Sequence, residues 1–90
     1  HLYPHQCLRK NGKNELLFIL NMTPMKWENY VVGVPKKKKY KLLLNSDDTR
    51  FAGNGNVIPK ELAAEAKPCN NKKYSITFDL PPYTAAIFLF

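Results

Sequence analysis

The chain has 90 residues, a hydrophobic fraction of 44% and a net charge of +7, which together indicate one small globular domain. This length excludes a second hydrophobic core, and the five Phe, five Tyr and one Trp argue against a disordered tail. No apolar run reaches the roughly 18 residues that a membrane-spanning helix needs, so we expect no membrane partner.

The first seven residues, HLYPHQC, share no pattern with the sequence that follows. His1, His5 and Cys7 are possible metal ligands, but no second ligand pair at zinc spacing exists elsewhere. We therefore expect residues 1–7 to be a frayed terminus, or one added by cloning, and residues 8–90 to be the single domain. The chain does not begin with Met and reads as a fragment of a longer protein.

Apolar and β-branched runs bounded by turn signals predict strands along the rest of the chain. Five runs have strand length: residues 15–22, 29–34, 40–45, 74–80 and 84–90. Residues 58–67 are ambiguous, because Pro59 and Pro68 leave fewer than about ten residues for a helix, and a short strand or a single turn is plausible there. This pattern predicts an all-β fold, an antiparallel β-sandwich of Greek-key type with about six to eight short strands.

Two of the predicted strands are apolar at nearly every position, namely residues 16–20 and 85–90. A strand with one face in water alternates between apolar and polar residues, so these strands indicate burial on both faces. Either loops of the domain itself cover the second face, or it is a surface for a partner or a neighbouring domain. Because an apolar run does not fix its own register, the outward parity stays open, and the candidates for interdomain packing are Leu17, Ile19, Ile87 and Leu89.

Much of the positive charge lies in predicted turns. Of the fourteen Lys and Arg residues, four lie at residues 36–39 and two at residues 72–73. Such runs are usually solvated loops that discourage edge-to-edge pairing of strands. No aromatic strand motif of the RNA-reading type accompanies them, so we expect no nucleic-acid partner and keep a basic anion-binding module only as an alternative.

The polar stretch NSDDTRFAGNGN, residues 45–56, matches no ligand-binding loop. It lacks the Lys-Ser/Thr of a phosphate-binding loop, the third glycine of the dinucleotide fingerprint and the bidentate Glu of a calcium loop. Asp47 and Asp48 are more typical of a turn. We therefore predict neither phosphate nor calcium binding here, and no metal or other cofactor for the chain.

No catalytic group is predicted. Both histidines fall within the first five residues, so a Ser or Cys nucleophile would have no base in the core. The seven Asp and Glu residues are dispersed over strand ends, turns and outward positions. Two isolated cysteines, Cys7 and Cys69, favour a reducing, cytoplasmic origin. The glycosylation sequon at Asn21 carries no meaning in such a compartment.

Five short motifs in fixed order resemble one known family. They are Asn21-Met22-Thr23-Pro24, Tyr30-Val31-Val32-Gly33-Val34-Pro35, Leu44-Asn45-Ser46-Asp47, Phe51-Ala52-Gly53 and Leu80-Pro81-Pro82. Over residues 8–90 this order resembles the C-terminal β-domain of 1,4-alpha-glucan branching enzymes of the alpha-amylase superfamily. Met22 replaces a Phe of that pattern, and Phe51-Ala52-Gly53 replaces Tyr-Gly-Gly.

The resemblance implies a division of labour. The parent enzyme would transfer α-1,4-glucan segments to α-1,6 branch points in glycogen biosynthesis, by a retaining mechanism. Its catalytic carboxylates would lie in a (β/α)₈ barrel outside this chain, so no residue here inherits a catalytic role. The domain would be a non-catalytic accessory unit whose partner is that barrel.

An alternative is a glucan-binding module that acts through exposed aromatic side chains. Stacking of sugar rings on aromatic faces is physically reasonable, and four aromatic residues flank predicted turns. The candidates for contact with α-glucan are Trp27, Tyr30, Tyr40 and Phe51.

Overall fold

Seven β-strands and their connections make up the part of the chain that the structure describes. The structure is a computed structural model that describes residues 3–47 and 58–90. The strands are β1 (His5–Asn11), β2 (Asn14–Asn21), β3 (Trp27–Val34), β4 (Lys39–Asn45), β5 (Glu61–Ala63), β6 (Tyr74–Leu80) and β7 (Thr84–Leu89). These residues contain no helix, and thus none with the length and hydropathy to cross a membrane.

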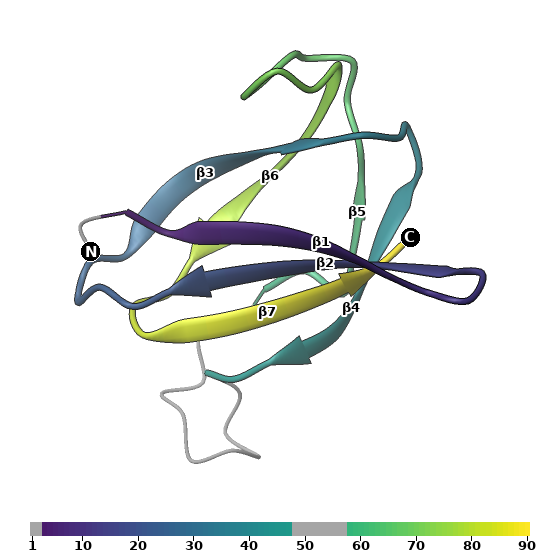
Figure 1. Ribbon diagram of the computed structural model, residues 1–90. Helices are drawn as coiled ribbons and strands as arrows, with labels where there is room; N and C mark the ends of the chain where they lie inside the picture. The colour runs from purple at the N-terminus through teal and green to yellow at the C-terminus, as the bar shows by residue number, and fades with distance from the viewer. Residues whose placement is uncertain (1–2, 48–57) are drawn as a thin grey trace.

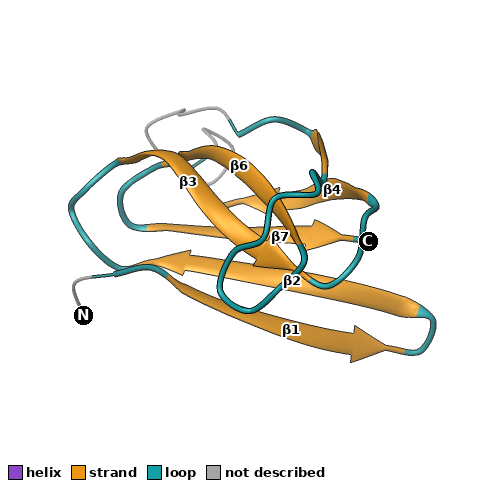
Figure 2. Ribbon diagram, turned by 90° about the horizontal axis from the view of Figure 1, so that it is seen from above, coloured by secondary structure: helices purple, strands orange, loops and turns teal. Residues whose placement is uncertain are grey.

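The strands form two sheets that face each other (Figure 1). The larger sheet has the order β1-β2-β7-β4-β5 and the smaller one pairs β3 with β6, with every pair antiparallel. Figure 2 shows β3 and β6 crossing over strands of the larger sheet. The predicted all-β antiparallel sandwich is therefore confirmed.

The five predicted strands are present with small shifts of their ends, and Tyr74–Leu80 agrees residue for residue. The ambiguous segment contains the three-residue strand β5. The first strand differs from expectation, because residues 5–7 do not lie outside the fold. They begin β1, where His5, Gln6 and Cys7 pair with Leu20, Ile19 and Phe18.

Two tight turns follow from residues that tolerate a positive φ. Gly12 has a φ of 61° at the first position of the two-residue turn between β1 and β2, where a type II′ turn favours glycine. Asn70 and Asn71 have φ values of 49° and 65° in a turn closed by two hydrogen bonds between the backbones of Cys69 and Lys72. Asparagine is the residue after glycine that adopts this left-handed conformation most readily.

The hydrophobic core lies between the two sheets. Strands β2 and β7 contribute Leu17, Ile19, Ala86 and Phe88, which are at most 1% exposed. The smaller sheet faces them with Val32, Val34, Ile76, Phe78 and Leu80. The rings of Phe78 and Phe88 meet edge to face with centroids 5.4 Å apart, so the aromatic contact joins the two sheets.

Gly33 permits a loop to pack closely on β3. A Cβ atom at this position would lie 2.2 Å from the carbonyl oxygen of Cys69, which is closer than any side chain could approach. The side-chain amide of Gln6 donates a hydrogen bond of 3.2 Å to the Gly33 carbonyl, which links β1 to β3. The glycine of the Tyr-x-x-Gly-Val-Pro motif is thus explained by packing.

Candidate functional site

Asn21 is a structural residue at the end of β2. Its side chain is completely buried and donates hydrogen bonds of 2.9 Å and 2.8 Å to the carbonyls of Met25 and Pro81. Its Oδ1 atom accepts hydrogen bonds from the amide and the hydroxyl of Thr23, at 3.0 Å and 2.6 Å. The Asn-Met-Thr-Pro motif therefore fixes the connection from β2 to β3 against the Pro81 turn, and the sequon is inaccessible.

A second polar cluster fixes the end of β4. The Asn45 side chain accepts a hydrogen bond of 3.0 Å from the amide of Asp47, which is the turn geometry expected for this motif. The Ser46 hydroxyl accepts one of 2.7 Å from the amide of Ala85. Both clusters thus flank the start of β7, where their hydrogen bonds fix the ends of the strands. The remainder of the predicted loop, residues 48–56, lies outside the described residues.

Three of the described carboxylates, those of Glu15, Glu65 and Asp79, are engaged in structural contacts. The Glu15 carboxylate accepts a hydrogen bond from Lys36, which lowers the pKa of that carboxyl, and Asp79 accepts one of 2.8 Å from the amide of Asn29. Glu65 pairs with Lys67 at 3.2 Å. Within residues 3–47 and 58–90 no three His, Cys, Asp or Glu side chains are grouped closely enough to hold a metal ion.

Tyr40, one of the four aromatic candidates for glucan contact, is a core residue. Its side chain is completely buried, its ring lies 4.6 Å from that of Phe90, and its hydroxyl donates a hydrogen bond of 2.8 Å to the Lys36 carbonyl. Burial raises the pKa of this phenol to about 12. No sugar can stack on this ring in the folded domain, which corrects its assignment to the surface.

Trp27 and Tyr30 lie at the margin of the core. They pair with Leu80 and Phe78, whose side chains are buried, and their own rings are half-buried with centroids 5.9 Å apart. The ring centroid of Tyr3 lies 5.9 Å from that of Trp27. Burial raises the pKa of the Tyr30 phenol. Glucan contact by these two residues stays a prediction, and Phe51 lies outside the described residues.

The outer face of the larger sheet, on the side away from β3 and β6, is apolar across its two central strands. The face of β2 and β7 opposite to the core is formed by Leu16, Phe18, Leu20, Ala85, Ile87 and Leu89. No strand of the described part covers these side chains, which are all partly exposed to solvent. We call this set of six residues the outer apolar face.

The parity of β2 corrects part of the sequence-based assignment. Leu17 and Ile19, two of the candidates for interdomain packing, are 0% and 1% exposed and belong to the domain's own core. The outward positions of β2 are their neighbours. Ile87 and Leu89, the other two candidates, do lie on the outer apolar face.

Positive charges border the outer apolar face on both sides. Strand pairing places Arg9, Leu16, Leu89 and Lys41 in one row across β1, β2, β7 and β4. Paired residues in neighbouring strands project from the same side of a sheet, so the row runs from a cation over two leucines to a second cation. An apolar centre with a polar rim is the usual anatomy of a protein interface.

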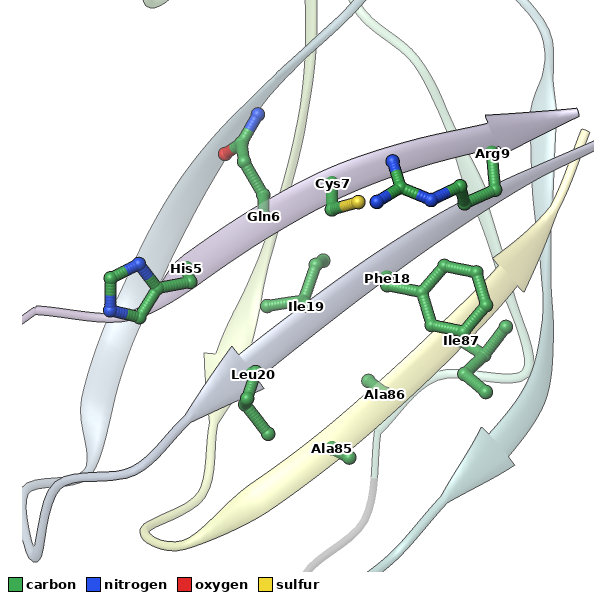
Figure 3. A pocket seen from close by; sticks show the side chains of 10 residues that line it. All are labelled: His5, Gln6, Cys7, Arg9, Phe18, Ile19, Leu20, Ala85, Ala86 and Ile87. Atoms are coloured by element: carbon green, nitrogen blue, oxygen red, sulfur yellow. The ribbon is translucent and has the colours of Figure 1, made fainter.

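A shallow pocket of about 350 Å³ opens on this face between β1, β2 and β7 (Figure 3). Its lining includes four members of the outer apolar face, namely Phe18, Leu20, Ala85 and Ile87. Figure 3 shows the Arg9 guanidinium reaching along β1 toward Cys7 at the rim. A pocket with this lining can accept an apolar side chain from a partner.

Comparisons with known proteins agree with this architecture. Residues 7–90 match the family described as the alpha amylase, C-terminal all-beta domain. The chain is 45% identical over 80 residues to a 1,4-alpha-glucan branching enzyme, GlgB, of Butyrivibrio fibrisolvens, covering 89% of this chain and 12% of that protein. It is 37% identical over 81 residues to GlgB of Geobacillus stearothermophilus, covering 87% of this chain and 13% of that protein.

A third relative is GlgB of Pseudoalteromonas atlantica, 36% identical over 81 residues, which cover 90% of this chain and 11% of that protein. The chain therefore spans about an eighth of the length of these relatives.

Proposed function

The chain belongs to the alpha-amylase C-terminal all-beta domain family, and we propose that it is the non-catalytic accessory domain of a 1,4-alpha-glucan branching enzyme. The enzyme would transfer α-1,4-linked glucan segments to α-1,6 branch points during glycogen biosynthesis. The relatives that carry this name support the proposal, since they match the chain over most of its length. The two free cysteines fit a reducing compartment, so we place the enzyme in the cytoplasm.

The outer apolar face carries this proposal. A soluble domain rarely leaves a contiguous apolar surface of several hundred Å² open to water. Six apolar side chains in three directly paired positions of β2 and β7 form a contiguous apolar surface here, and none of them is buried. The cations on either side, Arg9 and Lys41, give this surface the rim of an interface.

We infer that the occupant of the outer apolar face is the catalytic barrel of the same enzyme. The relatives are about eight times longer than this chain, and the matched segment is described as a C-terminal domain, so most of their length precedes it. The domain would stabilise the barrel by packing. The reacting carboxylates would lie in the barrel, as the retaining chemistry of such enzymes requires a converging pair.

Activity and heat resistance together test this function. The 90-residue chain alone should form no α-1,6 linkages from amylose. In the full-length polypeptide, Phe18→Lys should shorten the half-life of branching activity on heating, because it places a charge on the outer apolar face. Thr77→Lys, an exposed position on the smaller sheet, is the matched control. Equal half-lives for the two variants would contradict the proposal.

Glucan binding at the margin of the core is the second candidate. Trp27, Tyr30 and Tyr3 form one chain of aromatic contacts, and the ring nitrogen of Trp27 has no hydrogen-bond partner among the described residues. The fluorescence of Trp27, the only Trp, reports on this cluster directly. Titration with maltoheptaose should shift the emission if the cluster binds glucan. An oligonucleotide titrated at two salt concentrations tests the basic-module alternative.

A further inference from the structure

Exposed apolar side chains gather at one end of the sandwich. The described part of the chain has seven large apolar side chains that are between 40% and 68% exposed, and only Val31 and Leu43 lie elsewhere. The other five are Tyr3, Leu20, Met22, Met25 and Tyr83. They belong to the end where β1 and β7 begin and β2 and β6 finish, at the side marked N in Figure 1. We call these five residues the Tyr83 patch.

The backbone holds the parts of this patch together. The amide of Tyr83 donates a hydrogen bond of 3.1 Å to the carbonyl of Thr23, which joins the turn before β7 to the connection after β2. Asn21 bonds to the carbonyls of both Met25 and Pro81 and ties the same two segments. Met22, Met25 and Tyr83 are thus presented by one fixed framework.

Tyr83 is held in a conformation that a large side chain rarely adopts. Its φ is 48°, in the left-handed region, and its side chain is 67% exposed. Strained backbone at an exposed position is a pointer to function when the surrounding structure imposes it, as the hydrogen bond to Thr23 does here. Tyrosine is also among the residues most often found as the energetic centre of an interface.

We propose that the Tyr83 patch is a second contact with the domain that precedes this chain in the branching enzyme, with Tyr83 as its aromatic anchor. This contact rests on the accessory role proposed above. Strand β1 begins at this end of the sandwich, where His5 pairs with Leu20. Leu20 belongs to both surfaces. The patch therefore continues the outer apolar face past the ends of the strands of the larger sheet.

Oxidative footprinting tests the contact with the chain's own side chains. Both methionines of the chain, Met22 and Met25, lie in the patch and are 60% and 55% exposed. Hydroxyl radicals oxidise exposed methionine and also label exposed tyrosine, phenylalanine and leucine, and peptide mass spectrometry locates the products. We expect Met22, Met25 and Tyr83 to react several-fold more slowly in the full-length polypeptide than in the 90-residue chain. Leu43, exposed at 51% on β4, is the internal control and should not change.

The possible outcomes separate this contact from the proposed function. One outcome is that Phe18 is protected in the full-length polypeptide while Met22, Met25 and Tyr83 react as fast as they do in the 90-residue chain. In that case the outer apolar face is an interface and the Tyr83 patch is not. If none of these residues is protected, both proposals fail. Protection that rises with the concentration of the 90-residue chain alone would identify a second copy as the occupant and overturn the inference.

Discussion

The buried side chain of Asn21 makes four hydrogen bonds and uses its full donor and acceptor capacity. Removing it would leave the amide and hydroxyl of Thr23 and two carbonyls short of partners in a dry environment. The asparagine of a sequence motif that resembles a family signature is therefore explained by its internal hydrogen bonds.

Replacing Asn21 should destabilise the domain strongly. We expect Asn21→Ala to lower the free energy of unfolding by at least about 2 kcal/mol, since each buried polar group left unpaired costs about 1–3 kcal/mol. Asn14→Ala, at the exposed opposite end of the same strand, should change it by less than about 0.5 kcal/mol. Urea unfolding measures both. Equal midpoints for the two variants would contradict the role of Asn21.

Ionisation of Tyr40 should lower the stability of the domain at alkaline pH. Burial raises its pKa from 10.0 in the unfolded chain to about 12 in the folded domain, so the neutral phenol is favoured by folding. Its contribution is complete below pH 10 and is lost as the pH rises toward 12. The free energy of unfolding should fall across this interval.

Tyr40→Phe separates this contribution from the others. Below pH 10 the variant is less stable by about 1 kcal/mol, because it loses the hydrogen bond to the Lys36 carbonyl, and its stability should fall less steeply between pH 10 and 12. Unfolding measured by denaturant at several pH values tests this. A decline as steep as that of the unmodified chain would show that another group titrates there.

The two faces of strand β2 lie in different environments, one in the core and one on the outer apolar face. Substitutions at two neighbouring positions test this assignment. In the 90-residue chain, Leu17→Lys should unfold the domain, because it buries an unpaired charge in the core and costs at least about 4 kcal/mol. Phe18→Lys, on the outer apolar face, should leave the fold intact. Circular dichroism and urea unfolding compare the two. Unfolding by Phe18→Lys and tolerance of Leu17→Lys would reverse the assigned faces.

Most of the strands could be predicted because β-branched and apolar runs ended at prolines and asparagines. The start of β3 was missed because a bulge at Glu28 and Asn29, the latter with a φ of 50°, interrupts the alternation after Trp27. Strand β1 was missed because it lies at the edge of its sheet and only Leu8 packs against the core.

The sequence predicted which two strands carry the candidate surface, but it did not predict which residues of those strands face outward. Burial on both faces follows from an apolar run, whereas the parity follows only from the pairing of β2 with β7 and the position of the smaller sheet. Tyr40 was placed at the surface because it follows a turn, yet its ring points between the sheets.

The charge of the molecule fits the proposed arrangement. Arg9 and Lys41 flank the outer apolar face, and the chain as a whole carries a net charge of +7. Complementary charge on a partner speeds association and sets its orientation. We expect the surface of the catalytic domain opposite Arg9 to carry carboxylates.

Without a larger partner, the outer apolar face should cause self-association. Sedimentation of the 90-residue chain over a series of concentrations should show weak dimers, because the exposed apolar side chains gain by leaving water. Phe18→Lys should shift the equilibrium toward the monomer, whereas Thr77→Lys should not. A chain that stays monomeric at every concentration would show that this face is stable in water.

Calorimetry of the full-length polypeptide tests most directly whether the domain is packed against the catalytic domain through its outer apolar face. We predict that this domain has no separate unfolding transition at the temperature of the isolated 90-residue chain, because it unfolds together with the domain that covers it. Phe18→Lys should release a separate transition at lower temperature. If the unmodified polypeptide already shows a transition at the temperature of the isolated chain, the domain is not stabilised by such a contact and the account is contradicted.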